Sequence, residues 1–215
     1  MWHNKRVSKG AHIEQESFDI IKAGLKRAFT EAETAIVQRV IHATGDFSFE
    51  DNIRFHPQAI KDGIEAIRNG KSILVDVQMV QSGINKKLLA AFGCNVLCYI
   101  SDPDVASEAG RLSMTRSECA MLKAFSEPYP TVNIGIAAIG NAPTALLKLI
   151  EIIDTTPAPP ALVIGVPVGF VMAEESKNLL LDIRHPFITS VGKKGGSSVA
   201  VAMLNALLKL SLQSI

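Results

Sequence analysis

Residues 132–153 read VNIGIAAIGNAPTALLKLIEII, and this stretch contains the pattern that decides the fold. It opens with a mostly unbroken apolar run over residues 132–139, which is typical of a strand covered on both faces of a parallel sheet. Gly140-Asn141-Ala142-Pro143 ends the run, and Pro143 suits an early helical position. Apolar residues then continue at helical spacing to the end of the stretch. The stretch therefore predicts one strand followed by one helix.

The same pattern recurs on both sides of this stretch. Four more short apolar runs, rich in Val and Ile, cover residues 72–80, 95–100, 161–166 and 187–191. Helical patterns lie between or after the runs, over residues 85–92, 105–125, 142–153, 173–181 and 197–212. This alternation predicts a three-layer α/β fold with a mainly parallel five-stranded sheet in a flavodoxin-like order. Ligands of such folds bind at the carboxyl ends of the strands.

The N-terminal part of the chain is predicted to add extra helices to this fold. Ser17 precedes an apolar series at helical spacing over residues 18–29, and its hydroxyl is suited to cap that helix. Thr30 and Glu33 form a capping-box pattern at the start of a second helix. A third helix is expected over residues 57–68, closed by an Asn-Gly pair.

Length and composition limit the class of molecule. With 215 residues, 47% of them hydrophobic, we expect one domain over residues 1–215, with residues 1–12 as a loosely ordered tail. The net charge of +1 gives no support for nucleic-acid binding. Cys94, Cys98 and Cys119 are too few for a disulfide framework, and their apolar setting predicts structural thiols rather than metal ligands. No signal peptide or membrane-length apolar segment is visible, which predicts a cytoplasmic protein without membrane contacts.

The first candidate for chemistry is the segment His42-Ala43-Thr44-Gly45-Asp46, at the end of a predicted helix. Arg39 lies three residues before His42, hence on the same helix face. Histidine is the side chain best matched to proton transfer near neutral pH. Two interpretations stay open: His42 is a proton donor aimed at a ligand, or it stabilises the carboxyl end of its own helix.

Three glycine-containing segments are candidates for binding an anion or a bulky ligand. Gly140-Asn141 precedes a helix whose N-terminus is favourable for an anion, although Asn141 is also suited to ordinary helix capping. Residues 165–170, GVPVGF, allow close approach of a ligand or of another backbone. Residues 192–198, GKKGGSS, form a basic glycine loop that suits carboxylates or phosphates, with a solvated loop as the alternative. The loop contains Lys193, Lys194, Gly195, Gly196 and Ser197.

Two further cations allow two interpretations each. Lys177 belongs either to a surface helix or to a ligand contact. Arg116, with Arg111 nearby, is suited to grip carboxylates through bidentate hydrogen bonds, or each arginine pairs with Glu108 or Glu118 on a helix surface. The sequence contains neither a Walker A motif nor a GxGxxG motif after the first predicted strand. The cations and glycines together therefore favour a large, flat ligand with several negative charges over a nucleotide.

These segments also occur, in the same order, in a known family. From about residue 10 to the C-terminus the chain resembles the precorrin-8X methylmutases, including their cobalt-precorrin-8 counterparts. The matching pieces are Ile13-Glu14, Ser17-Phe18, His42-Ala43-Thr44-Gly45-Asp46, Val75-Asp76, Met79-Val80, Thr115-Arg116-Ser117, residues 140–146 and 165–171, Glu175-Ser176-Lys177, Gly195-Gly196-Ser197 and Asn205-Ala206-Leu207. Residues 2–9 do not follow the family. The resemblance implies a flavodoxin-like fold, a homodimer, and a ring-contracted tetrapyrrole substrate that carries several acetate and propionate groups.

The resemblance also implies a reaction and roles for particular residues. A methyl group moves from ring carbon 11 to ring carbon 12 in a [1,5]-sigmatropic shift, which gives hydrogenobyrinate, or cobyrinate if cobalt is present. His42 matches the catalytic histidine, which protonates or hydrogen-bonds a ring nitrogen. Ser17, Arg39 and Arg116 match substrate contacts, and Asn85 stands where some relatives have Thr. The predicted substrate-binding set also contains Gly140, Asn141, Lys177, Lys194, Gly195, Gly196 and Ser197. No separate cofactor and no metal ligand is implied.

Two classes of function are therefore compared. One is an isomerase of cobalamin biosynthesis, and the other is a flavodoxin-like module that binds tetrapyrroles or other anions without transforming them. The match at His42 favours the enzyme. Hand-over of the product to another enzyme of the cobalamin pathway is a further hypothesis.

Overall fold

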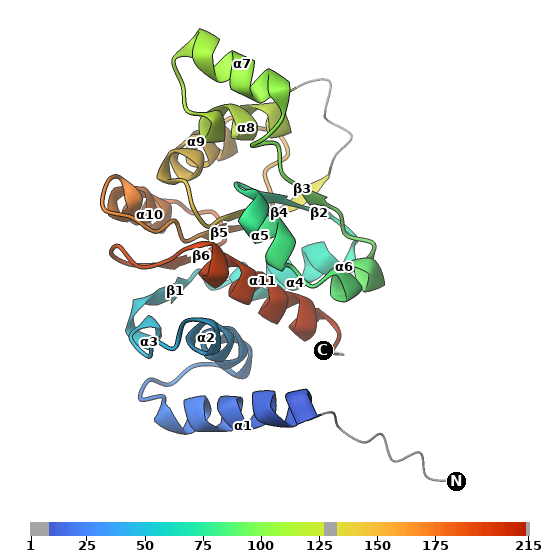
Figure 1. Cartoon of the computed structure of the whole chain (residues 1–215), viewed down its shortest axis with the longest axis vertical. Coiled ribbons are helices and arrows are strands. Elements are labelled where there is room, and N and C mark those ends of the chain that lie inside the picture. The colour runs from blue at the N-terminus through green and yellow to red at the C-terminus, as the bar shows by residue number, and fades with distance from the viewer. Residues whose placement is uncertain (1–8, 127–132, 214–215) are drawn as a thin grey trace.

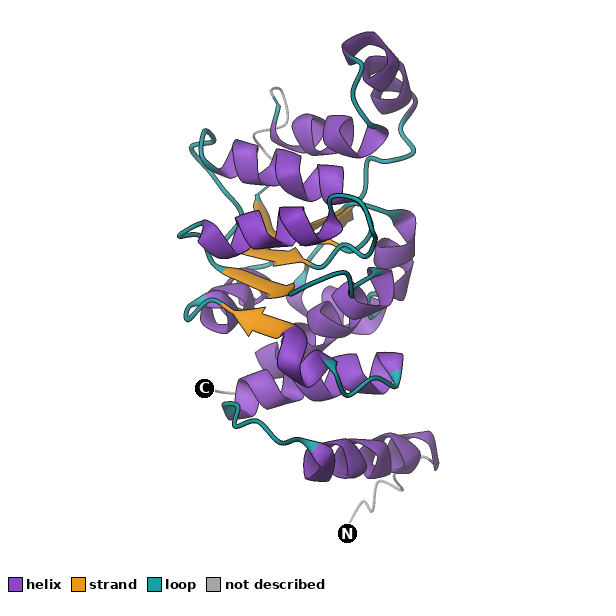
Figure 2. Ribbon diagram, turned by 90° about the vertical axis from the view of Figure 1, so that its left-hand side faces the viewer, coloured by secondary structure: helices purple, strands orange, loops and turns teal. Residues whose placement is uncertain are grey.

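The computed structural model describes residues 9–126 and 133–213, in which a sheet lies between layers of helices (Figures 1 and 2). The strands are β1 (Ile53–Phe55), β2 (Ser72–Val75), β3 (Val96–Leu97), β4 (Ile134–Ile139), β5 (Leu162–Gly165) and β6 (Phe187–Ser190). The helices are α1 (Lys9–Gly24), α2 (Glu31–Thr44), α3 (Phe49–Asn52), α4 (Ala59–Arg68), α5 (Gln78–Gly83), α6 (Lys86–Phe92), α7 (Pro103–Leu112), α8 (Arg116–Phe125), α9 (Pro143–Ile153), α10 (Ala173–Asp182) and α11 (Ser197–Ser211).

The sheet confirms the predicted α/β class and corrects its strand count. The order is β1-β6-β5-β4-β2-β3, and every neighbouring pair is parallel except β1 and β6. When β1 is left out and the five parallel strands are renumbered 1 to 5 in chain order, their order in the sheet is 2-1-3-4-5. This is the predicted flavodoxin-like order. The sixth strand, β1, has only three residues with Arg54 in the middle, so no apolar run reveals it. Its place depends on antiparallel pairing with β6, where Ile53 lies opposite Ser190.

The sheet separates two hydrophobic cores. Helices α2, α4, α5, α6 and α11 contribute to the core on one face, while α8, α9 and α10 cover the other face with α7 packed on α8. All six residues of β4 are buried, as expected for a strand covered on both faces. Helix α1 packs against α2, buries only Ile21, and lies at the lower end of the molecule in Figure 1. No helix in the described ranges is long and apolar enough to cross a membrane.

Two predicted elements have different bounds in the structure. The helix predicted over residues 105–125 is two helices, because Ser113 adopts a left-handed conformation with a φ of 54° and Thr115 starts α8 with a capping box. The strand predicted over residues 72–80 ends at Val75, and α5 begins at Gln78. Continuous apolar character does not distinguish a buried strand from the start of a buried helix, which explains the second error. Val132, the first residue of another predicted run, lies outside the described residues.

The first predicted helix is displaced along the chain. Helix α1 starts at Lys9 and ends at Gly24, so Ser17 lies inside it instead of capping it, and residues 9–12 are helical. The Ser17 hydroxyl donates to the carbonyl of Ile13 at 2.8 Å, which is how a serine is accommodated within a helix. The second helix follows the prediction: Thr30 and Glu33 complete the capping box, and Gly45 ends α2 with a φ of 67°.

Candidate active site

The carboxyl ends of the parallel strands bring several predicted segments to one edge of the sheet. Asp76 follows β2, Gly140 follows β4, residues 166–169 follow β5, and residues 192–196 follow β6. This edge is where ligands of flavodoxin-like folds bind, at the point where the strand order reverses. In this sheet the reversal lies between β2 and β4.

At that point the protein supplies its own anion. The Asp76 carboxylate is fully buried and accepts hydrogen bonds from the backbone N–H groups of Gly140, Asn141 and Ala142 at 3.0, 2.7 and 2.8 Å. Burial raises the pKa of Asp76, and the three N–H donors oppose that effect. The prediction that Asn141 caps α9 is wrong, because Ala142 occupies the N-cap position and no side chain of that turn caps the helix. The N–H groups of Gly140 and Asn141 are therefore occupied, and only the exposed amide side chain of Asn141 is open to a ligand.

The loops after β5 and β6 lie against each other. The N–H of Gly196 donates to the carbonyl of Val166 at 2.8 Å, and the N–H of Gly169 donates to that of Lys193 at 3.2 Å. A Cβ atom at Gly195 would lie 2.2 Å from the Val166 carbonyl oxygen. The close approach that these glycines allow is therefore made by another backbone, which was one of the two predicted interpretations.

The first turn of α11, next to this contact, is open. Helix α11 has no side-chain cap, and its first helical hydrogen bond runs from Ala200 to Gly196. Within the described residues, the backbone N–H groups of Ser197, Ser198 and Val199 have no acceptor. These groups lie at the positive end of the helix dipole and beside Lys194, which favours an anionic group.

The side chain of Lys194 joins the basic glycine loop to the segment that contains His42. Its ammonium contacts Asp46 Oδ2 at 2.5 Å and Ser48 Oγ at 2.6 Å. The hydrogen bond from Lys194 lowers the pKa of Asp46 to about 2, with a further contribution from Ser48. Two segments that are about 150 residues apart in the chain therefore meet in the fold, although the Lys194 ammonium already has a carboxylate partner.

Lys177 lies on the buried face of α10, and its side chain reaches this loop. Its side chain has no exposed area, and its ammonium donates to the backbone carbonyl of Lys194 at 2.7 Å. Burial lowers the pKa of Lys177 to about 8, and Glu174 opposes that effect. Ser190 Oγ donates to the same carbonyl at 2.8 Å.

His42 itself lies in the last turn of α2 and is exposed. Its ring centroid is 5.2 Å from that of Phe18, which α1 presents to it. His42 and Ser17 face a shallow hollow of about 260 Å³. The rest of its lining consists of Ile20, Ile21, Ile41, Gly45 and Phe47. The structure therefore brings Ser17 and His42 together across two helices, on an open surface with an aromatic neighbour.

Arg39 also contacts Phe18. Its guanidinium pairs with Glu14 at 2.5 Å and lies 4.6 Å from the Phe18 ring centroid. The hydrogen bond from Arg39 lowers the pKa of Glu14. From sequence, Phe18 belonged to the apolar series of a helix and to the Ser17-Phe18 family motif, and in the structure it contacts both His42 and Arg39. The pairing with Glu14 was not predicted, because a residue on one helix gives no local signal of the helix that will cover it.

Two predicted binding residues, Arg116 and Asn85, lie at the starts of other helices. Arg116 is exposed at the start of α8 and has no partner within the described residues, while Arg111 pairs with Glu108. Asn85 caps α6 by accepting from the N–H groups of Lys87 and Leu88, so its side-chain oxygen is engaged in the fold. In Figure 1, α8 lies near the upper end of the molecule and α2 near the lower end. Within one chain, the helix that carries Arg116 is therefore distant from the helix that carries His42.

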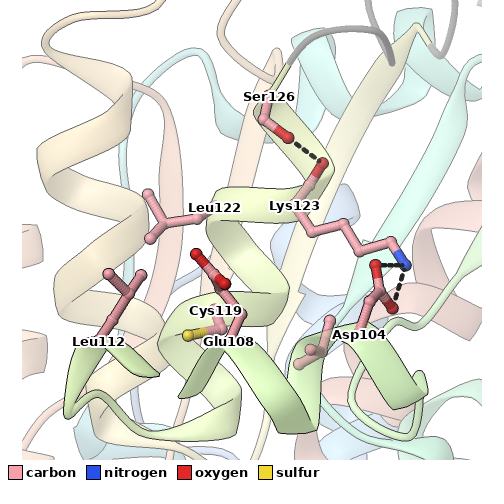
Figure 3. Close-up of a pocket in the computed structure, with 8 residues that line it drawn as sticks. Asp104, Glu108, Leu112, Cys119, Leu122, Lys123 and Ser126 are labelled. Atoms are coloured by element: carbon pink, nitrogen blue, oxygen red, sulfur yellow. Dashed lines mark hydrogen bonds and ion pairs between the residues drawn. The ribbon is translucent and has the colours of Figure 1, made fainter. Parts of the chain in front are cut away.

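A further hollow, of about 320 Å³, lies between α7 and α8 (Figure 3). Lys123 on α8 contacts Asp104 of α7 at 2.7 Å, and Cys119 lies against the same hollow. Cys94 and Cys119 are buried and Cys98 is partly buried, and burial raises the pKa of each thiol. None of the predicted site residues lines this hollow, so it is separate from the candidate site.

The fold and the edge just described define a class: a flavodoxin-like α/β protein with loops arranged for an anionic ligand. Comparison with known proteins gives the family. A family model described as precorrin-8X methylmutase matches residues 12–210. A cobalt-precorrin-8 methylmutase of Priestia megaterium is 52% identical over 91% of this chain and 85% of its own length. A precorrin-8X methylmutase of Pseudomonas aeruginosa is 39% identical over 94% of this chain and 96% of its own.

A solved structure agrees with these relatives. The crystal structure of a precorrin-8X methyl mutase from Thermus thermophilus has a TM-score of 0.85 and 40% identity, over 93% of this chain and 95% of that one. The chain belongs to the precorrin-8X methylmutase family, as its sequence motifs predicted. It is therefore an isomerase of the methylmutase type, and the non-catalytic binding module is not favoured.

Proposed function

We propose that this enzyme moves a methyl group from ring carbon 11 to ring carbon 12 of precorrin-8X or cobalt-precorrin-8, giving hydrogenobyrinate or cobyrinate. The observation that carries the proposal is the position of His42. The imidazole is exposed at the end of α2, beside the Phe18 ring, and it makes no hydrogen bond to a described residue. A flat ring system resting on the open surface around Phe18 would meet an imidazole free to donate or accept a proton.

In this proposal His42 protonates or hydrogen-bonds a ring nitrogen of the substrate. Such a contact accelerates the methyl shift only if it is stronger in the transition state than in the bound substrate. The methyl migrates within one molecule, so the step needs no external donor or acceptor and no separate cofactor. The work of the protein is to fix the ring and to stabilise the charge that shifts during migration.

The acidic side chains of the substrate are proposed to bind away from His42. The open N–H groups at the start of α11 suit a carboxylate, and Lys193 and Lys194 add positive charge beside them. Arg39 and Ser17 are proposed contacts near the ring, and the Asn141 amide and Asn85 are proposed to contact its periphery. The exposed guanidinium of Arg116 has no partner among the described residues and suits bidentate binding of a carboxylate.

A homodimer is part of the proposal. The loop after β5 exposes apolar side chains, with Phe170 86% and Val171 78% accessible. Apolar area of this kind is typical of an interface. A second copy would also supply a route for Arg116 to reach a site from which it is distant in its own chain. We further propose that residues 1–215 form a single domain, that the enzyme acts in the cytoplasm, and that it passes its product to another enzyme of the pathway.

The test is turnover by the purified protein. Precorrin-8X, and separately its cobalt form, is mixed with the enzyme while the visible absorption spectrum is followed, and the product mass is measured. An isomer of unchanged mass with the product chromophore is expected. Ligand binding without spectral change for either form would support the binding module instead.

A matched pair of histidine variants tests the role of His42. His42→Ala is expected to lower turnover by about 100-fold or more, because general acid–base groups typically contribute about 10²–10⁴-fold. Binding should be largely retained, because the proposed carboxylate contacts lie elsewhere. His56→Ala is the control, since His56 packs on Phe187 at the amino end of β6. Turnover by His42→Ala equal to that of the control would reject the catalytic role.

A further inference from the structure

Lys177 combines features that its helix alone does not explain. It belongs to α10, yet its side chain is completely buried and reaches the loop after β6. A buried ammonium is costly unless it is hydrogen-bonded. Its hydrogen-bond acceptor is the backbone carbonyl of Lys194 at 2.7 Å. The family motif at residues 175–177 therefore places a cation where it contacts a backbone rather than solvent.

The Lys194 carbonyl is held from two sides. Ser190 Oγ donates to it at 2.8 Å and Lys177 Nζ at 2.7 Å, so both lone pairs of that oxygen are used. The next two residues, Gly195 and Gly196, lack side chains that would restrict the backbone. Two donors on one carbonyl therefore fix the orientation of a loop that glycine alone would leave free.

What this loop presents is the proposed carboxylate site. The side chain of Lys194 contacts Asp46 and Ser48, and Ser197 opens α11 with its uncapped N–H groups. A rotation of the peptide that follows Lys194 would move both features. His42, in contrast, is held by α2 and its Gly45 cap, and the hydrogen bond of the Lys177 ammonium goes to neither of them.

We infer that Lys177 is a positioning residue of this enzyme: its buried ammonium holds the Lys194 carbonyl and so sets where the basic glycine loop meets the substrate carboxylate. The inference rests on the proposed function. It assigns Lys177 an indirect role, because a side chain without exposed area does not touch a ligand while the loop keeps this position.

The experiment compares Lys177→Met with Ser190→Ala, the two ways to remove a donor from the same carbonyl. Methionine has a similar length and no charge, and replacing a buried charge by an apolar side chain is often neutral for stability. KM for the tetrapyrrole is expected to rise about 10-fold in Lys177→Met and about 3-fold in Ser190→Ala, with kcat within about 2-fold of wild type. The double variant should show less than the product of the two effects.

The control is Ser211→Ala, which removes a buried hydroxyl that donates to the Leu207 carbonyl at 2.8 Å within α11. It should leave KM unchanged. An unchanged KM in Lys177→Met would overturn the inference, as would a fall in kcat that only follows the loss of folded protein. An unchanged KM in Ser190→Ala, together with a raised KM in Lys177→Met, would indicate that Lys177 contacts the substrate directly and would also overturn it. A wild-type enzyme that binds without turnover would reject the proposed function alone, and the same comparison would then be made on Kd.

Discussion

Two backbone turns at the same edge of the sheet differ in what occupies their N–H groups. After β4, the turn at residues 140–142 donates three hydrogen bonds to the buried Asp76 carboxylate. After β6, the first turn of α11 has no side-chain cap and no acceptor within the described residues. Both turns precede a helix, so the local geometry is of the same kind. The difference is whether the protein supplies the anion itself.

This difference supports the proposed position of a substrate carboxylate. The point at which strand order reverses is the usual ligand position in this fold, and here Asp76 closes it. The open N–H groups also lie at the carboxyl ends of the strands but after β6, next to β1 in the strand order, where Lys194 contacts Asp46. If the substrate carboxylate binds as proposed, the fold rule gives the correct end of the strands but not the pair of strands, because the Asp76 carboxylate already occupies the N–H groups after β4.

The largest expected effect comes from removing the carboxylate that accepts hydrogen bonds from the turn at residues 140–142. Asp76→Ala should lower the free energy of unfolding by about 3–5 kcal/mol, because it leaves three buried N–H donors without an acceptor. Asp76→Asn should cost less, since one oxygen remains to accept. Urea denaturation monitored by circular dichroism measures both. Equal stability of Asp76→Asn and wild type would mean that the charge of the carboxylate is not needed.

A smaller effect is expected from adding a methyl group where the loops after β5 and β6 meet. Gly195→Ala should cost about 2–3 kcal/mol, because its Cβ would lie 2.2 Å from a backbone oxygen that has little room to move. Gly140→Ala makes the same test at the turn that binds Asp76, because its Cβ would lie 2.9 Å from Ser197 Cα. Gly110→Ala in α7 is the control, since nothing lies within 4 Å of its Cβ and alanine favours a helix. If Gly195→Ala were as stable as the control, the contact between the two loops would not be tight.

Much of the fold could be predicted because it depends on local patterns. The capping box at Thr30, the continuous apolar strand β4 and Pro143 at the start of α9 each have a sequence signal that reflects one physical requirement. β1 could not be predicted in this way, because three residues with a central arginine form a strand only through their pairing with β6. Ser17 shows how a local signal can mislead, because a serine hydroxyl can cap a helix or donate to a carbonyl within it.

The candidate site was predictable in its residue types and less so in its arrangement. His42, Lys194 and the glycines stand where the sequence motifs indicated, and Lys194 joins two of the motifs. Asp76 stood in the Val75-Asp76 motif, inside the strand predicted over residues 72–80, and its partners are on a turn more than 60 residues away. Lys177 had no signal of burial, because the residues that bury it belong to other elements. Contacts between distant segments are set by the packing of the whole sheet.

The smallest expected effect concerns the ion pair that borders the open turn. Asp46 has its pKa lowered from 3.8 to about 2, mainly by the hydrogen bond from Lys194. The folded state therefore binds this proton less readily than the unfolded state, so the stability that the pair contributes is present above about pH 4 and is lost as pH falls toward about 2. Because both side chains are partly exposed, the loss should be at most about 1 kcal/mol, and smaller at high salt. The measurement is the difference in urea midpoint between wild type and Asp46→Asn across this pH range, with Asp51→Asn as the control. A difference that stays constant with pH would show that Lys194 is held by its backbone alone, and that the open turn keeps its position without the side-chain contact.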